Sequence, residues 1–223
     1  MKLDKSPETI RTMFNMIAEK YDFMNNIISF GTQRFIKYKC IENLDIQPHS
    51  NILDLCTGTG DLAKIIKKLY PLSTITGIDL SEKMIHIAKD KVRGVKFFQG
   101  DATELPFSDK TFDIVTMGFG LRNIQNPEKA IEQIYRVLKP NGLFLHLDFG
   151  EKNFLNKIFD KTVPILAKIF SKNTYAYSYL IKSKKTFLTP DDLINDFEKK
   201  GFVLQKRKEY LFKVISCQIM KKN

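Results

Sequence analysis

The sequence has few of the features that mark disulfide-rich, metal-binding or membrane-spanning proteins. Only three cysteines occur, Cys40, Cys56 and Cys217, and they are far apart. An odd, scattered set gives neither a disulfide framework nor the spacing of a metal site, so we expect a reducing compartment and no metal. No stretch approaches the roughly 20 apolar residues of a membrane span, and the N-terminal residues lack the apolar core of a signal peptide. These absences predict a soluble, cytoplasmic protein.

Positive charge is plentiful but unevenly placed. The chain has 223 residues, enough for one domain with a full core, and a net charge of +11. Residues 1–150 hold 20 basic and 18 acidic residues, whereas residues 151–223 hold 16 basic and 7 acidic ones. A basic region can bind an anionic membrane surface or nucleic acid. It can equally be a lysine-rich face in contact with water, and the sequence leaves that choice open.

Residues 51–63, NILDLCTGTGDLA, predict a buried parallel strand, a glycine turn and a helix in succession. Glycine lets backbone N–H groups and a helix N-terminus come close to a ligand. Nineteen residues after Gly60, at the end of a second apolar run over residues 74–78, comes Asp79. A carboxylate there can accept hydrogen bonds from the two hydroxyls of a ribose. The two elements together predict a nucleoside site.

The turn also carries a carboxylate, in the order Asp54-x-Cys56-x-Gly58-x-Gly60. A dinucleotide site would have Gly-x-Gly-x-x-Gly instead. A carboxylate at the mouth of the turn repels a pyrophosphate and favours a cationic ligand; the alternative is that Asp54 caps the following helix. The pattern resembles the first motif of class I S-adenosylmethionine-dependent methyltransferases, which usually have glycine where Cys56 stands. Their cofactor is a sulfonium with an amino-acid tail, so the charges agree.

Beyond this turn the chain alternates strands and helices. Further strands are expected at residues 95–99, 112–117 and 143–149, with helices starting at residue 81 and spanning 127–138. Such alternation predicts an α/β fold with a doubly wound, mostly parallel sheet. We expect one Rossmann-like domain with these parts: N-terminal helices in 1–50, a cofactor-binding core in 51–150, an inserted helical cap in 151–187, and a completion of the sheet in 188–223, with a helix over 190–200 and a last strand near 210–220.

Five stretches carry a closer resemblance, in order: AEKYDFMNNIISFG at 18–31, the turn at 54–62, FGLRN at 119–123, YRVLKP at 135–140 and AYSYL at 176–180. They look like the ubiquinone/menaquinone biosynthesis C-methyltransferase family. YRVLKP occurs in many methyltransferases, whereas FGLRN directly after the fourth strand is far more particular. The resemblance implies S-adenosylmethionine as cofactor and methylation of a ring carbon of a polyprenylated benzoquinol or naphthoquinol, as in the conversion of demethylmenaquinol to menaquinol.

The resemblance and the motifs predict which residues bind the cofactor and the substrate. For the cofactor they are Asp54, Gly58, Thr59, Gly60, Asp79, Asp101, Ala102 and Gly118, the last standing where serine is frequent. For the substrate they are Tyr21 and Asn25, on helices expected over the cofactor, and Tyr177 in the cap.

Methyl transfer to a ring carbon needs an electron-rich ring, and the ring proton must leave afterwards. Arg122 can stabilise a phenolate or orient a water, although guanidinium is a poor base. Asn123 can hydrogen-bond the same oxygens, and Asp148, at a strand end, is a candidate proton acceptor. Of the three histidines only His146 is a candidate, and we expect it to be structural.

Two departures from the family concern the lipid-binding side. Residues 211–220 lack the glycine- and histidine-containing ending of the family, and Lys184 and Lys185 stand where an apolar residue is more usual.

Two other functions stay open. One is methylation of RNA, ribosomal protein or another small aromatic compound, although no Asn-Pro-Pro-Tyr-type turn follows the fourth strand. The other is nucleoside binding without catalysis, which would leave FGLRN unexplained.

The expected partners follow from the quinol substrate. We expect contact with the inner face of the membrane through the aromatic, lysine-rich residues 151–187, and no nucleic acid. The sequence leaves open whether the chain forms a homodimer, and whether the ring belongs to the menaquinone or the ubiquinone pathway.

Overall fold

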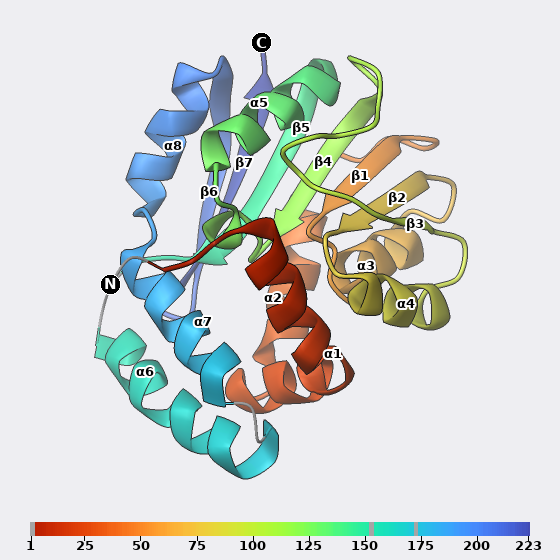
Figure 1. Cartoon of the computed structure of the whole chain (residues 1–223). Helices are drawn as coiled ribbons and strands as arrows, with labels where there is room; N and C mark the ends of the chain where they lie inside the picture. Colours follow the sequence, from red (N-terminus) through yellow and green to blue (C-terminus); the bar gives the residue numbers. More distant parts are fainter. Residues whose placement is uncertain (1–2, 152–153, 172–173) are drawn as a thin grey trace.

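A computed structural model describes residues 3–151, 154–171 and 174–223 of the chain (Figure 1). One seven-stranded sheet has the order β3-β2-β1-β4-β5-β7-β6. The strands are β1 (Asn51–Leu55), β2 (Thr74–Asp79), β3 (Lys96–Gln99), β4 (Phe112–Gly118), β5 (Leu138–Phe149), β6 (Phe202–Tyr210) and β7 (Ile215–Lys222). The first five pair in parallel, β7 runs antiparallel to β5, and β6 runs antiparallel to β7. The predicted Rossmann-like, mostly parallel sheet is confirmed.

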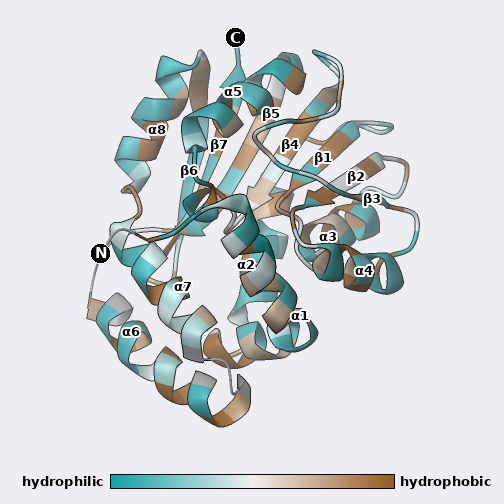
Figure 2. Ribbon diagram, in the orientation of Figure 1, coloured by the Kyte–Doolittle hydropathy of each residue, from teal (hydrophilic) through white to brown (hydrophobic). Residues whose placement is uncertain are grey.

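Helices cover both faces of this sheet. They are α1 (Pro7–Ile28), α2 (Thr32–Glu42), α3 (Asp61–Leu69), α4 (Glu82–Lys91), α5 (Pro127–Val137), α6 (Phe154–Leu166), α7 (Thr174–Thr186) and α8 (Pro190–Lys199), with a 3-10 turn η1 (Leu121–Asn123) and a π-helical turn η2 (Ala167–Ser171). One core joins α2, α3 and α4 to the sheet, and a second joins α5 and α8 to its other face. Side chains of β1 alternate between them, Ile52 to the first and Leu53 and Leu55 to the second. Figure 2 shows the central strands as the most hydrophobic part of the ribbon.

The N-terminal helix lies across the carboxyl ends of the parallel strands (Figure 1). Ser6 caps α1 by accepting a hydrogen bond from the backbone of Thr9, and Pro7 occupies the first helical position. One apolar side of α1 packs against Met84 of α4 and Tyr179 of α7. Its C-terminal half packs against α6 and α7. We call α6, η2 and α7 the helical cap; together with α1 it encloses the carboxyl edge of the sheet.

The end of the chain differs from the prediction. In place of one last strand near residues 210–220, two antiparallel strands form a hairpin, and its turn occupies residues 211–214. The sequence missed β6 because its polar run QKRKE lacks a clear apolar alternation. Such charges are tolerated there because β6 is an edge strand.

A smaller difference concerns residues 139–142, which lie between the expected helix over 127–138 and the expected strand over 143–149. The structure has one strand, β5, from Leu138 onward, with an irregularity in its pairing to β4 between Phe112 and Ile114. The left-handed backbone of Asn141 (φ +64°) lies within this bulge. Within the described ranges, no helix is both long and apolar enough to cross a membrane.

Candidate active site

Two adjoining cavities lie at the carboxyl edge of the sheet, where β1 and β4 end. The larger has a volume of about 460 Å³ and extends between α1, the α1–α2 turn and the helical cap. The smaller, about 100 Å³, lies between α1 and the ends of β1 and β2. Seven residues line both: Phe14, Tyr21, Cys56, Gly58, Gly118, Phe119 and Asn123. A ligand of one cavity therefore comes close to a ligand of the other.

The smaller cavity contains the predicted ribose-binding carboxylate. Asp79 ends β2 and accepts hydrogen bonds from the backbone N–H groups of Gly58 (2.8 Å) and Ser81 (2.9 Å). Burial raises the pKa of Asp79, and these backbone hydrogen bonds oppose the shift. The structure thus joins the two motifs that predicted a nucleoside site.

Three more predicted cofactor residues lie on the smaller cavity. Asp101 follows β3 and accepts hydrogen bonds from the backbone (2.8 Å) and hydroxyl (2.9 Å) of Thr103. Ala102, beside it, is buried with its apolar side chain in the core. Gly118 ends β4, and a Cβ there would lie 2.9 Å from the Leu62 side chain. A serine at this position would therefore require the end of Leu62 to move.

The glycine turn has a left-handed backbone at Gly58 (φ +55°), Gly60 (φ +80°) and also Cys56 (φ +52°). Residues with a side chain adopt this conformation only at a cost in free energy, whereas glycine does not. This explains why the resembled motif usually has glycine at the position of Cys56. The side chain of Cys56 fits because its neighbour Gly120, just after β4, has no side chain. A Cβ on Gly120 would lie 2.5 Å from the Cβ of Cys56. Burial, and next the charge of Asp79, raise the pKa of the Cys56 thiol well above its usual value, so the thiol stays protonated.

Asp54 lies beneath this turn rather than open at its mouth. Its carboxylate is 1% exposed and accepts hydrogen bonds from the hydroxyls of Thr57 (2.5 Å) and Thr116 (2.6 Å). Burial raises its pKa to about 6, against the opposing effect of these hydroxyls and of the Ala63 backbone in the first turn of α3. Asp54 thus holds the turn and the start of α3 in place, and it also lines the larger cavity, so its role toward a cationic ligand stays a prediction.

Thr59 belongs to a network that the sequence did not predict. Its hydroxyl donates to Asp22 of α1 (2.5 Å), and Lys91 of α4 binds both Asp22 (2.6 Å) and Asp61 (2.5 Å). Lys37 of α2 donates to the other oxygen of Asp61 (2.8 Å). Burial would raise the pKa of Asp61, but the two lysines hold it below its usual range. The network joins α1, α2, α3 and α4 around the glycine turn, and it occupies the Thr59 hydroxyl.

Arg122 lies on the wall of the larger cavity, in the 3-10 turn after β4. One guanidinium nitrogen donates to the carboxylate of Asp148 (2.7 Å) and to the carbonyl of Phe119 (2.8 Å). The side chains of Arg122 and Asp148 are 5% and 1% exposed. The guanidinium also lies over the rings of Phe119 and Phe149, 5.6 and 5.1 Å from their centroids. Arg122 is therefore a buried cation in contact with two aromatic rings, on the wall of the larger cavity.

A model of the ubiE/COQ5 methyltransferase family matches residues 2–222. The chain belongs to this family. A demethylmenaquinone methyltransferase of Thermotoga maritima is 38% identical over 206 residues, which cover 89% of this chain and 90% of the relative. Another, of Staphylococcus aureus, is 36% identical over 88% of this chain and 86% of its own length.

Solved structures show the same fold. An S-adenosylmethionine-dependent methyltransferase of Thermotoga maritima gives a TM-score of 0.70 at 21% identity and covers 95% of this chain and 99% of its own. One of Aquifex aeolicus gives 0.65 at 17% identity, with both chains covered completely. Together with the family match, they make this protein an S-adenosylmethionine-dependent methyltransferase, as the sequence predicted.

The residues of the smaller cavity fit this cofactor. Asp79 presents a half-buried carboxylate where a ribose needs hydrogen-bond acceptors. Asp101 and Ala102 line the same cavity beyond it, on the side expected for adenine. Gly58 lines both cavities, so a cofactor held by these residues would lie next to the larger one. No three side chains of His, Cys, Asp or Glu gather as a metal site within the described residues.

The larger cavity of this methyltransferase contains the residues expected at the substrate. Tyr21 and Asn25 lie one helical turn apart on α1, and both residues line the cavity. Burial raises the pKa of Tyr21, so its phenol stays protonated. Tyr177 of α7 is 4% exposed and lines the cavity, and Asn123 donates to the carbonyl of Phe119 (3.3 Å).

Two candidates from β5 lie elsewhere. Neither Asp148 nor His146 is among the residues that line the two cavities. His146 is fully buried, with one ring nitrogen 2.9 Å from the side chain of Gln218, and burial lowers its pKa, which suits the structural role predicted for it. The structure revises Asp148 from a proton acceptor in the pocket to the partner that holds Arg122.

The sequence missed Tyr179, two residues beyond Tyr177. Tyr179 lines the larger cavity, and its hydroxyl is buried with no hydrogen-bond partner within the described residues. Burial raises the pKa of Tyr179 to about 12, so its hydroxyl stays protonated and can donate a hydrogen bond to a ligand oxygen. The AYSYL motif could have indicated this residue, because it contains Tyr179 as well as Tyr177.

Proposed function

We propose that this enzyme methylates a ring carbon of a polyprenylated quinol in respiratory quinone biosynthesis, with demethylmenaquinol as the substrate. One observation carries the proposal: a buried guanidinium, Arg122, lies on the wall of a large apolar cavity that adjoins the cofactor residues. Demethylmenaquinone methyltransferase is also the name of the relatives, which favours a naphthoquinol over a benzoquinol ring.

The cavity wall suits such a ring and its chain. Apolar side chains form much of the lining, among them Ile17, Ile28, Phe159, Leu180 and Val214. An apolar wall binds a ring and a prenyl chain and excludes water, which strengthens the few polar contacts inside. It is unsuited to a charged nucleotide, so we expect no nucleic-acid substrate.

Arg122 activates the ring by holding the quinol oxygen as a phenolate. Asp148 and the Phe119 carbonyl fix one nitrogen of the guanidinium, while its Nε is buried with no hydrogen-bond partner within the described residues. Because the fork has five N–H donors, it can hold Asp148 and still donate to a ligand. S-adenosylmethionine, when bound, supplies the methyl group and the leaving group.

The ring proton must leave after methyl transfer. Arg122 stays protonated and cannot accept it, and Tyr21 and Tyr179 are neutral phenols. A water held between Arg122 and the ring is therefore the acceptor in this proposal. Asn123, on both cavities, can position the quinol oxygen or that water.

A polyprenyl substrate resides in the bilayer, and none of the helices in the described part of the chain can cross one. We therefore propose that the enzyme works as a peripheral protein at the membrane surface.

The test is the quinone composition of cells that lack the protein. Accumulation of demethylated quinone, reversed by the wild-type gene but not by an Arg122→Lys variant, would support the proposal. Unaltered quinone together with a missing RNA methylation would contradict it and favour the nucleic-acid alternative.

A further inference from the structure

Exposed apolar side chains gather on the side of the molecule where the larger cavity lies. Twelve of the sixteen large hydrophobic residues that are exposed among the described residues belong to α1, α2, the turn between them, the helical cap or the β6–β7 turn. They are Met16, Phe23, Phe30, Phe35, Phe154, Ile158, Ile165, Ile169, Phe170, Tyr175, Leu211 and Phe212. Isolated exposed hydrophobic residues are ordinary, but a concentration on one side of a molecule marks an interaction surface.

Four of these residues also line the larger cavity and form its rim: Phe30, Ile158, Leu211 and Phe212. Phe30 of the α1–α2 turn is 89% exposed and Phe212 of the β6–β7 turn is 85% exposed. Each contributes to the cavity wall and at the same time presents a ring to the outside. The rim therefore continues the apolar lining of the cavity onto the molecular surface.

Phe30 and Phe212 both have a left-handed backbone, which is unfavourable for phenylalanine. Phe30 has φ +50°, and the three consecutive residues Leu211, Phe212 and Lys213 have φ of +51°, +52° and +69°. Asparagine or glycine would satisfy the same turns at lower cost. Aromatic residues at positions with unfavourable exposure and unfavourable backbone indicate a requirement other than folding.

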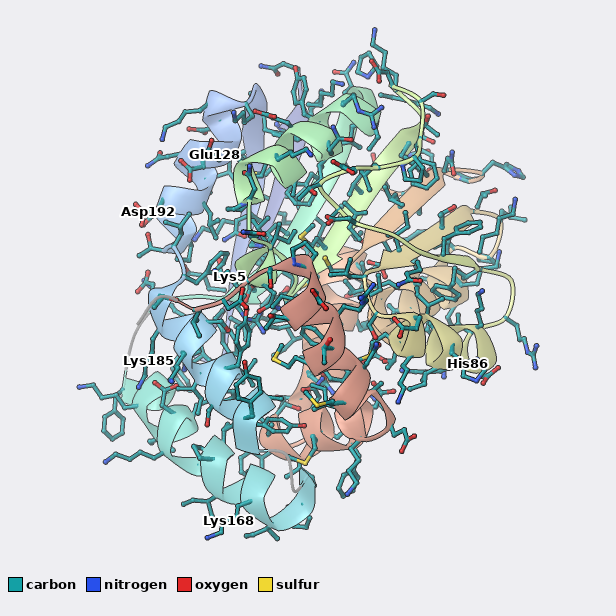
Figure 3. All side chains as sticks on the ribbon, viewed as in Figure 1. Lys5, His86, Glu128, Lys168, Lys185 and Asp192 are labelled. Carbon is teal, nitrogen blue, oxygen red and sulfur yellow. The ribbon has the colours of Figure 1, made fainter. Side chains whose placement is uncertain are left out.

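The charges around the rim are complementary to an anionic surface. Lys157 and Lys161 of α6 and Lys168 of η2 are exposed between the apolar side chains of the helical cap. The acidic residue of this segment, Asp160, is ion-paired with Lys184 (2.5 Å), which leaves a positive excess. Lys168 lies at the outer end of the helical cap in Figure 3, and the ribbon of α6 alternates hydrophobic and hydrophilic residues in Figure 2. Apolar residues among lysines are typical of segments that lie in a membrane interface.

We propose that the rim is a membrane-docking surface, in which Phe30 and Phe212 insert into an anionic bilayer while the lysines of α6 and η2 bind its headgroups. The cavity then opens directly into the hydrocarbon region, and a polyprenyl quinol enters sideways without crossing water. This inference rests on the proposed function for the class of substrate, and it adds the surface through which that substrate arrives. It also moves the main apolar contact from residues 151–187 to two turns outside them.

The test is flotation of the enzyme, with S-adenosylmethionine bound, on vesicles of phosphatidylcholine alone or mixed with phosphatidylglycerol. The double variant Phe30→Asn, Phe212→Asn removes both rings and places residues that tolerate left-handed backbone, so it should fold. We expect binding to both vesicle types to fall by at least about 10-fold for each ring removed. Leu72→Asn is the matched control, because Leu72 is 62% exposed but lies at the opposite edge of the sheet, before β2.

The lysines should give a different signature. Each change of Lys157, Lys161 or Lys168 to glutamine should weaken binding about 5-fold on anionic vesicles, with no effect on neutral ones. The chain has no tryptophan, so Phe30→Trp introduces a single tryptophan as a fluorescent probe. Its emission should shift to shorter wavelength on vesicles and be quenched by brominated lipid chains.

The outcomes separate this inference from the proposed function. If the wild type methylates a water-soluble quinol analogue but floats with neither vesicle, or if the double variant floats as well as the wild type, the docking surface is refuted and the function stands. Flotation that depends on both rings, without methylation of any quinol, would support the surface and refute the function. If sedimentation shows a wild-type dimer that the double variant abolishes, with no flotation, the rim is an interface between two copies of the chain and the membrane proposal is overturned.

Discussion

Replacing Arg122 with lysine keeps a positive charge on the cavity wall but removes the planar fork of donors. In the structure one guanidinium nitrogen already serves Asp148 (2.7 Å) and the Phe119 carbonyl (2.8 Å), so only the remaining N–H groups can serve a ligand. A lysine ammonium that stays with Asp148 has no second, fixed donor for the quinol oxygen. Loss of one preorganised donor at a developing anion lowers turnover by about 10² to 10³-fold, or about 2.7–4 kcal/mol.

The assay is single-turnover methylation of a short-chain quinol analogue at saturating cofactor. Binding of S-adenosylmethionine, measured by calorimetry, should stay close to wild type, because Arg122 does not line the smaller cavity. Arg136→Lys is the matched control: Arg136 is paired with Asp109 on the outside of α5 and lines neither cavity.

Wild-type turnover in the lysine variant would refute the assignment of Arg122 as the phenolate partner. Tyr179 would then be the next residue to change, since Asp148 and His146 do not reach the cavities. Arg122→Ala is unsuitable for this purpose, because it leaves the Asp148 carboxylate buried and unpaired, which costs about 3–5 kcal/mol of folding free energy.

Three further predictions concern the cofactor side. Asp79→Ala should weaken S-adenosylmethionine binding by about 1.5–3 kcal/mol, the range for hydrogen bonds to a charged group; equal affinities by calorimetry would show that the carboxylate does not hold the ribose. Cys56→Gly should leave the free energy of unfolding unchanged or raise it by up to about 1 kcal/mol, whereas Cys56→Val should lower it, because φ is +52° there; urea unfolding of both variants checks this, and similar losses in the two would contradict it. Asp54 has a folded pKa of about 6 against 3.8 in the unfolded chain, so wild-type stability should fall by up to about 3 kcal/mol as pH rises from 4 through 6. Asp54→Asn lacks this loss, so its stability relative to wild type should increase over that range; a constant difference between the two would mean that Asp54 does not titrate there.

Local patterns in the sequence predicted much of the sheet and the start of the cofactor site. The apolar run at residues 52–55, the glycine turn and Asp79 all lie in elements that follow one another in the chain. Their spacing alone placed them at the carboxyl edge of a parallel sheet. The same holds for the start of α1, where Ser6 and Pro7 act locally.

Long-range pairs could not be predicted in this way. Arg122 and Asp148 are 26 residues apart and meet only because β4 and β5 are neighbours in parallel register. The sequence placed both at the carboxyl edge but assigned Arg122 a ligand as its counterion, where the fold supplies a carboxylate. Likewise the ion pairs of Lys37 and Lys91 with Asp61 could not be predicted from neighbouring residues. Each lysine resembles an ordinary surface lysine in the sequence, and the pairs form only because α2 and α4 pack beside α3.

The attachment of α1 has a kinetic consequence. Asp22 ties this helix to Thr59 and Lys91, while Tyr21, one residue before, lies over both cavities. Moving α1 away breaks hydrogen bonds between part-buried charged groups, each worth about 1.5–3 kcal/mol. An open form is then populated at roughly 10% or less, so release of the spent cofactor, rather than methyl transfer, should limit steady turnover. Rapid mixing should show a first methylation faster than those that follow, and Asp22→Asn should reduce that difference. If the first and later turnovers proceed at one rate, α1 does not control the exchange.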